Sequence, residues 1–159
     1  MEQVAYYPSP IGWLRLAAGR EGLAGVWPVA EEGQDGNGTG EILARTADWL
    51  GRYFSGREPG ELPPLQMQGT PYQREVWKLL LEIPYGTTVT YGELARRLTL
   101  RRGAPGTSAR AVGGAVGRNR LAILVPCHRV VGADGSLTGY AWGTEKKAAL
   151  LAHEGIRLG

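Results

Sequence analysis

The chain changes character at residues 57–69, and this change constrains its fold more than any other feature of the sequence. The segment contains Pro59, Pro63 and Pro64, which suit a linker between folded parts. Short runs with strand character precede it, and signals that start helices recur after it. We therefore expect an N-terminal domain at 1–56, the linker at 57–69 and a C-terminal domain at 70–159.

The N-terminal part predicts a small antiparallel sheet with one helix. Its three strands are expected at Gln3–Tyr7, Trp13–Ala17 and Leu23–Trp27. The segment Glu31–Gly40 has four glycines and no apolar residue, which predicts a mobile loop. An amphipathic helix should follow and stop at Gly56, because apolar residues recur at helical spacing at Leu43, Ala47, Leu50 and Phe54.

The C-terminal part predicts mostly helices. A capping box at 70–73 starts a helix that should run to about Glu82, and a second box at 90–93 starts a short one. After the connection Thr99–Gly106, Ser108 should cap a helix at Ala109–Val116. Two short helices joined by a turn indicate a helix-turn-helix.

The apolar run Leu121–Val125 predicts a short buried strand that leads into Pro126-Cys127. Together with the sheet and helix expected before residue 57, this strand places the chain in the α/β class, of the α+β kind.

Charge is divided between the two parts. Residues 1–69 carry a net charge of −4 and residues 70–159 a net charge of +7, which together give the chain its +3. The stretch 94–133 holds eight arginines, no lysine and no acid. Such a stretch repels itself unless a polyanion neutralises it, and the arginine fork suits phosphate. We therefore expect this stretch to bind nucleic acid rather than to form only a solvated surface.

The helix expected at Ala109–Val116 contains Gly113 and Gly114, each of which costs roughly 1 kcal/mol relative to alanine in a helix interior. One explanation is tight packing against another helix. The other is that Ala109, Ala111 and Gly113 form a small face that lets the backbone lie close in the narrow minor groove of DNA.

The chain has a single cysteine, Cys127, so it has no internal disulfide, and its two histidines argue against a metal site. A lone cysteine is most often buried and inert. Here it follows a proline at a strand end and precedes His128, a candidate base, while Arg120 and Arg129 should add positive charge that favours the thiolate. From these residues alone, a cysteine hydrolase is also conceivable.

Three motifs resemble one family. They are Pro126-Cys127-His128-Arg129-Val130-Val131, the helix segment from Ala109 to Ala115, and Leu150-Leu151-Ala152-His153-Glu154-Gly155. They are similar to the O6-alkylguanine-DNA alkyltransferases, also called methylated-DNA–protein-cysteine methyltransferases. The resemblance covers nearly all of residues 70–159.

The resemblance implies that the protein flips O6-alkylguanine out of duplex DNA and transfers the alkyl group irreversibly to Cys127, once per molecule. Four residues would assist the cysteine: His128 as its base through a water, Glu154 polarising that histidine, Tyr91 donating to guanine N3, and Asn119 ordering the network. Arg110 would fill the gap in the base stack. The resemblance also implies DNA contacts by Ala109, Ala111 and Gly113 of the same helix and by Arg118 just after it.

The guanine pocket implied by the resemblance involves Val130, Tyr140, Ala141, Trp142 and Lys147. Ala141-Trp142-Gly143 departs from the commoner family pattern, and Trp142 should narrow the pocket mouth. The connection Thr99–Thr107 is longer than usual, which leaves the geometry between the two helices open. The zinc-binding cysteines of some family members are absent, so we expect no metal and no cofactor.

The expected partner is double-stranded DNA containing O6-alkylguanine, and the protein is expected to act as a cytoplasmic monomer. No apolar run of membrane-spanning length and no signal peptide is visible in the sequence. The alternative function is that of a non-catalytic protein that binds alkylated DNA lesions. The presence of Cys127 argues against this alternative.

Overall fold

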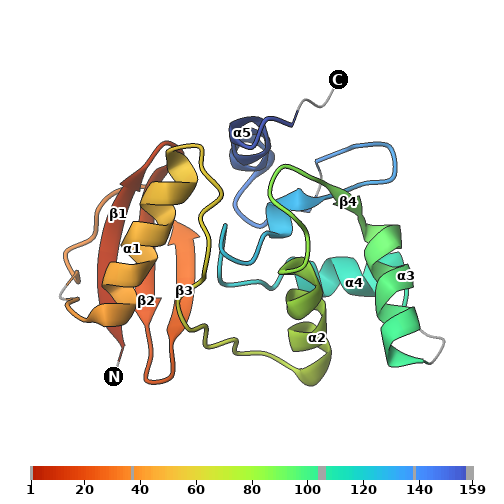
Figure 1. The fold of residues 1–159 in the computed structure, drawn as a ribbon, viewed down its shortest axis with the longest axis horizontal. Helices are drawn as coiled ribbons and strands as arrows, with labels where there is room; N and C mark the ends of the chain where they lie inside the picture. Colours follow the sequence, from red (N-terminus) through yellow and green to blue (C-terminus); the bar gives the residue numbers. More distant parts are fainter. Residues whose placement is uncertain (1, 37, 104–106, 138, 157–159) are drawn as a thin grey trace. The chain divides into compact units, whose positions relative to one another are not determined.

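The computed structural model describes residues 2–36, 38–103, 107–137 and 139–156 (Figure 1). The chain forms two compact units. The first comprises Met1–Gln68 with Arg120–Ala122, and the second comprises Gly69–Asn119 with Ile123–Gly159. The division expected from the sequence did not include Arg120–Ala122 in the first unit.

The first unit contains a three-stranded antiparallel sheet in the order β1-β2-β3. Its strands are β1 (Gln3–Ser9), β2 (Gly12–Ala18) and β3 (Leu23–Pro28). Ser9 pairs with Gly12 across the first hairpin, where Gly12 has a φ of 105° that favours glycine. The expected meander is confirmed, with each strand longer by one or two residues.

Helix α1 (Glu41–Phe54) contacts all three strands and lies along the sheet (Figure 1). Its buried residues are Leu43, Thr46, Trp49, Leu50 and Tyr53, and the Trp49 and Tyr53 rings stack with centroids 5.6 Å apart. Ala47 and Phe54, expected on the buried face, are half-buried. The face is rotated because the aromatic rings of Trp49 and Tyr53 bury more apolar surface.

The expected loop before α1 forms no helix or strand in its described residues, 31–36 and 38–40. Asp35 joins it to the sheet: its carboxylate accepts a hydrogen bond from Arg15 Nη2 (2.9 Å) and another from the hydroxyl of Tyr6.

The second unit contains helices α2 (Pro71–Leu80), α3 (Tyr91–Arg102), α4 (Ala109–Val116) and α5 (Thr144–His153). A parallel pair of two-residue strands, β4 (Val89–Thr90) and β5 (Val130–Val131), was not expected from the sequence. Each of these strands is too short to show a hydrophobic period.

The helix starts follow the expected caps. Thr70 and Gln73 make both bonds of a capping box, and Ser108 Oγ accepts from the Ala111 amide at 3.1 Å. Thr90 Oγ1 accepts from the Glu93 amide at 3.0 Å, which is one of the two bonds of a box. Helix α2 ends at Leu80, two residues before the expected end at Glu82.

Helix α3 is longer than expected and runs to Arg102, where Gly103 ends it in the left-handed conformation. The expected connection Thr99–Gly106 is therefore helical in its first half, and residues 104–106 lie outside the described residues. Helices α3 and α4 contact each other and α2 (Figure 1). Trp77 Nε1 on α2 donates to the Ala115 carbonyl at 2.8 Å, which ties α2 to α4.

The strand expected at Leu121–Val125 is wrong. The segment is buried, as its apolar run implies, but it forms a turn in which Ile123 has a φ of 72°. Its start makes an isolated bridge to β3: the Val26 amide donates to Arg120 (2.9 Å) and the Ala122 amide donates to Val26 (3.0 Å). An apolar run predicts burial more securely than backbone conformation.

Within the described parts of the chain, no helix is long and apolar enough to cross a membrane. The same residues contain no cluster of three or more His, Cys, Asp or Glu side chains that could hold a metal ion.

Candidate active site

Cys127 begins a single 3-10 turn, Cys127–Arg129, directly after Pro126. Only 3% of the Cys127 residue is exposed. Asn119, just after α4, donates from Nδ2 to Cys127 Sγ (3.2 Å) and to the Val125 carbonyl (3.0 Å). The buried Asn119 amide thus fixes both the sulfur and the backbone that precedes it.

A buried ionic cluster lies beside the cysteine. Glu154, at the end of α5, accepts a hydrogen bond from His128 Nε2 at 2.6 Å. It also accepts from Arg129 Nε at 2.8 Å and from the Gly86 amide at 2.9 Å. His128 is fully buried, and Arg129 and Glu154 are each 7% exposed. A buried carboxylate requires such partners, so the site is built around Glu154.

Burial raises the pKa of Cys127 from its ordinary value of 9.0 to about 11, while the Asn119 hydrogen bond and the charge of Lys147 oppose the rise. The resting group is therefore a thiol. The expectation that Arg120 and Arg129 favour the thiolate is wrong. The Arg129 guanidinium binds Glu154, and Arg120 is an exposed residue of the first unit.

Burial lowers the pKa of His128, and Glu154 opposes that shift. The imidazole that follows Cys127 in the chain is therefore held in its neutral form, which is the form that can accept a proton.

The reactivity of Cys127 toward iodoacetamide should rise about tenfold per pH unit from pH 7 until it levels near pH 11, because only the thiolate reacts. The intact mass, followed over time at each pH, measures this rate. The same cysteine in denatured protein is the control, and its rate should level about two units lower. A folded-state plateau below pH 9 would contradict the buried thiol.

Tyr91, Tyr140 and Lys147 all lie close enough to the sulfur to interact with its charge. Lys147 is fully buried on α5, with its Nζ 5.8 Å from the centre of the Tyr91 ring. Tyr140 is buried and packs edge-on against Trp142, with ring centroids 5.3 Å apart. Two phenols and the charged side chain of Lys147 therefore lie near the Cys127 thiol.

A cavity of about 510 Å³ opens beside Tyr91. Four of its lining residues were expected in the site: Tyr91, Ala109, Arg110 and Gly113. The other four were not expected: Thr90, Gly92, Ala133 and Gly139. Gly139 has a φ of +88°, and a Cβ there would lie 2.9 Å from the Tyr91 hydroxyl. Only glycine leaves this part of the cavity open, a constraint that no sequence signal reveals.

The remaining expected pocket residues do not line this cavity. Val130 is fully buried in β5 and pairs with Val89, Ala141 is exposed, and Trp142 is half-buried.

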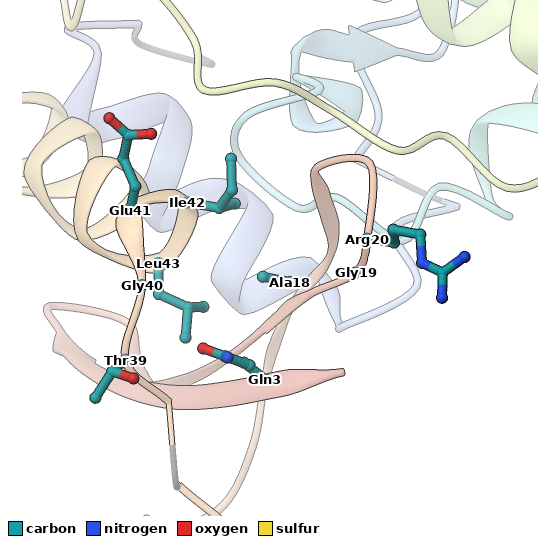
Figure 2. A pocket seen from close by; sticks show the side chains of 9 residues that line it. All are labelled: Gln3, Ala18, Gly19, Arg20, Thr39, Gly40, Glu41, Ile42 and Leu43. Carbon is teal, nitrogen blue, oxygen red and sulfur yellow. The ribbon is translucent and has the colours of Figure 1, made fainter. Parts of the chain in front are cut away.

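A smaller cavity of about 330 Å³, in the first unit, lies at the start of α1 and is lined by residues including Gln3, Arg20 and Glu41 (Figure 2). It contains none of the residues expected to take part in chemistry, so we place the candidate site at the cavity beside Tyr91.

The exposed face of α4 includes Arg110, Ala111, Gly114 and the following Arg118. A Cβ at Gly114 would meet nothing within 4 Å, and one at Gly113 would meet the Tyr91 ring at an ordinary 3.6 Å. Tight packing against a neighbouring helix therefore does not require either glycine. Because Gly113 and Gly114 have no side chains, they instead leave a smooth helix surface next to the cavity.

The arginine-rich stretch has acidic partners from elsewhere in the chain. On α3, Arg96 and Arg97 bind Glu93, Arg101 binds Glu82, and Arg102 lies 3.7 Å from Glu75. Among the residues that the structure describes, no ion pair involves Arg110, Arg118 or Arg120. Fewer arginines of this stretch therefore lack an acidic partner in the described part of the chain than the sequence suggests. Two of those that lack one there are Arg110, on α4, and Arg118, just after it.

Comparison with known proteins places this arrangement in a family. Residues 71–156 match the family described as 6-O-methylguanine DNA methyltransferase, DNA binding domain. The methylated-DNA–protein-cysteine methyltransferase of Mycolicibacterium paratuberculosis is 44% identical over 151 residues, which cover 92% of this chain and 88% of that protein.

Two solved structures from Mycobacterium tuberculosis are also similar. The O6-methylguanine methyltransferase has a TM-score of 0.83 at 40% identity and covers 100% of this chain and 96% of its own. The OGT in complex with DNA has a TM-score of 0.82 at 42% identity, with coverages of 96% and 92%. Because the family match spans more than half of the chain and these relatives align over most of their length, the chain belongs to the 6-O-methylguanine DNA methyltransferase family.

Proposed function

We propose that the protein repairs DNA by transferring the alkyl group of O6-alkylguanine, chiefly O6-methylguanine, to Cys127. The observation that carries this proposal is a single buried thiol, held by Asn119 and followed directly by a histidine that is bonded to Glu154. Similarity to an OGT solved in complex with DNA supports DNA as the partner. The protein acts as a monomer on one lesion.

Recognition requires the base to leave the stack, because a thiolate cannot reach the O6 substituent inside a duplex. The smooth face of α4 approaches the minor groove, with Ala109, Ala111 and Gly113 toward the DNA and Arg118 near phosphate. Arg110 fills the gap, and the flipped guanine enters the cavity of about 510 Å³. Tyr140, Ala141, Trp142 and the Val130 carbonyl complete the surroundings of the guanine.

Transfer then proceeds in one displacement. His128 removes the proton of Cys127 through a water, and Glu154 stabilises the imidazolium. The sulfur attacks the alkyl carbon, the bond from carbon to O6 breaks, and its electron pair passes to guanine. Tyr91 donates a hydrogen bond to N3, with Lys147 beside its ring, so guanine leaves with less negative charge. The product thioether has no good leaving group, so each molecule reacts once.

The test is to mix the protein with duplex DNA containing one O6-methylguanine and to measure the intact mass. The mass should increase by one methyl group, located on Cys127 by peptide mapping, and should saturate at one per molecule. Duplex with unmodified guanine is the control. Several turnovers per molecule, or tight lesion binding without a mass increase, would overturn the proposal, and the second result would indicate a lesion-binding protein.

Replacing Arg110 with alanine should slow repair of duplex DNA roughly 100-fold, since unstacking a base costs a few kcal/mol and about 1.4 kcal/mol is a factor of ten. Reaction with the free base O6-methylguanine should fall far less, because no stack is opened. Single-turnover rates on both substrates measure the difference. The matched control is Arg120→Ala, which removes an exposed arginine of the first unit. Equal losses on both substrates would contradict the role in flipping.

A further inference from the structure

Arg129 is buried and makes three hydrogen bonds that none of the steps above uses. Its Nε and Nη2 donate to the two oxygens of Glu154, at 2.8 and 3.2 Å, and its Nη1 donates to the Ile83 carbonyl at 2.8 Å. The guanidinium also lies over the Tyr85 ring, 5.7 Å from its centre. An arginine held by three hydrogen bonds and one ring contact is fixed in position.

Arg129 and His128 share one carboxylate. Oε2 of Glu154 accepts from His128 Nε2 (2.6 Å) and from Arg129 Nη2 (3.2 Å), while Oε1 accepts from Arg129 Nε and the Gly86 amide. Arg129 is permanently charged, so it already neutralises the single negative charge of Glu154. A proton on His128 would therefore leave the buried cluster with a net positive charge, which a low dielectric disfavours.

We propose that Arg129 is a positioning residue that holds Glu154 in place and keeps His128 uncharged until Cys127 transfers its proton. This inference rests on the proposed alkyl transfer, in which His128 is the base. Without Arg129, Glu154 and His128 would form a simple ion pair, and the base would be protonated before the lesion arrived. The charged groups that face His128 are Glu154, Arg129 and Lys147, with the Tyr85 phenol facing Glu154.

The electrostatics of the site agree with this arrangement. Burial is the main cause that lowers the pKa of His128, Glu154 opposes it, and the charges of Arg129 and Lys147 lower it further. In the wild type, proton transfer from the thiol to the imidazole creates one negative and one positive charge in the same step. The net charge of the buried site therefore does not change in this proton transfer.

The experiment is an NMR titration of the His128 imidazole in the whole protein. Arg129→Met removes the charge and should raise the pKa of His128 by about one unit or more, whereas Arg129→Lys retains a charge and should leave it near the wild-type value. His153, the second histidine of the chain, is the internal reference, and its signal should be the same in all three proteins. If Arg129→Met does not fold, Arg129→Gln replaces it, because glutamine keeps a donor for the Ile83 carbonyl.

The rate of a single turnover on O6-methylguanine DNA supplies the second readout. Its decline at acidic pH should move to higher pH by the same amount in Arg129→Met and not in Arg129→Lys. A His128 titration that is equal in wild type and Arg129→Met would overturn the proposal, as would an equal shift in the lysine variant. The titration needs no alkyl transfer, so it tests the role of Arg129 independently of the proposed function.

Discussion

Cys127→Ala should abolish alkyl transfer completely while the protein still binds duplex DNA containing O6-methylguanine. The thiol is the only one in the chain, so no other sulfur can accept the group. The binding surface of α4 and the cavity beside Tyr91 do not contain this residue. The Asn119 amide keeps its bond to the Val125 carbonyl, so the turn that carries residue 127 should persist. Intact mass and equilibrium binding measure the two properties.

Cys127→Ser is the matched control, because its hydroxyl retains an acceptor for Asn119 but is a far weaker nucleophile. Both variants should lack transfer, and serine should be the more stable of the two by about 1 kcal/mol. Transfer by either variant would show that another group is the acceptor. A folded variant that does not bind the lesion would show that the sulfur itself takes part in recognition.

Glu154→Ala should destabilise the protein by about 3–5 kcal/mol, because it leaves the buried Arg129 guanidinium without a counter-ion. It also removes the acceptor of the Gly86 amide and of His128 Nε2. Alkyl transfer should fall in parallel, since His128 loses the group that stabilises its protonated form. Urea denaturation and single-turnover rates measure these two effects.

Glu82→Ala is the control for this prediction. Glu82 binds Arg101 with two bonds of 2.6 and 2.9 Å, a geometry as good as that of Glu154 with Arg129, but both side chains are about half exposed. An exposed pair contributes about 0–1 kcal/mol. Equal destabilisation by the two substitutions would mean that burial does not determine the strength of the Glu154 pair.

Helix caps and tight turns could be predicted from the sequence, because each depends on residues only a few positions apart. The hydrogen bonds of Thr70 with Gln73 and of Ser108 with Ala111 join residues three apart, so the sequence contains both partners in one short window. The hairpin turn at Gly12 is similar. The helix-turn-helix pair α3 and α4 followed from the caps at Thr90 and Ser108, although α3 extends further because Gly103, rather than Thr99, ends it.

Features that depend on distant partners were not predictable. Leu121–Val125 reads as a strand, but Arg120 and Ala122 bond to Val26 of β3, and no apolar pattern encodes that bridge. The arginines of α3 seemed to lack counter-ions because Glu75 and Glu82 lie outside the arginine-rich stretch. Gly139 belongs to the cavity only because the Tyr91 hydroxyl lies beside it.

The sequence by itself determined which groups are available: one thiol, a histidine next to it, and a helix whose exposed residues are small apart from its arginine. It also pointed to the family through motifs that are contiguous in the chain. The tertiary structure decided the state of those groups. Burial keeps Cys127 a thiol, and Arg129 binds Glu154, a residue 25 positions away, rather than the sulfur. The physical reason is that charge and solvation depend on neighbours in space, which a linear sequence does not show.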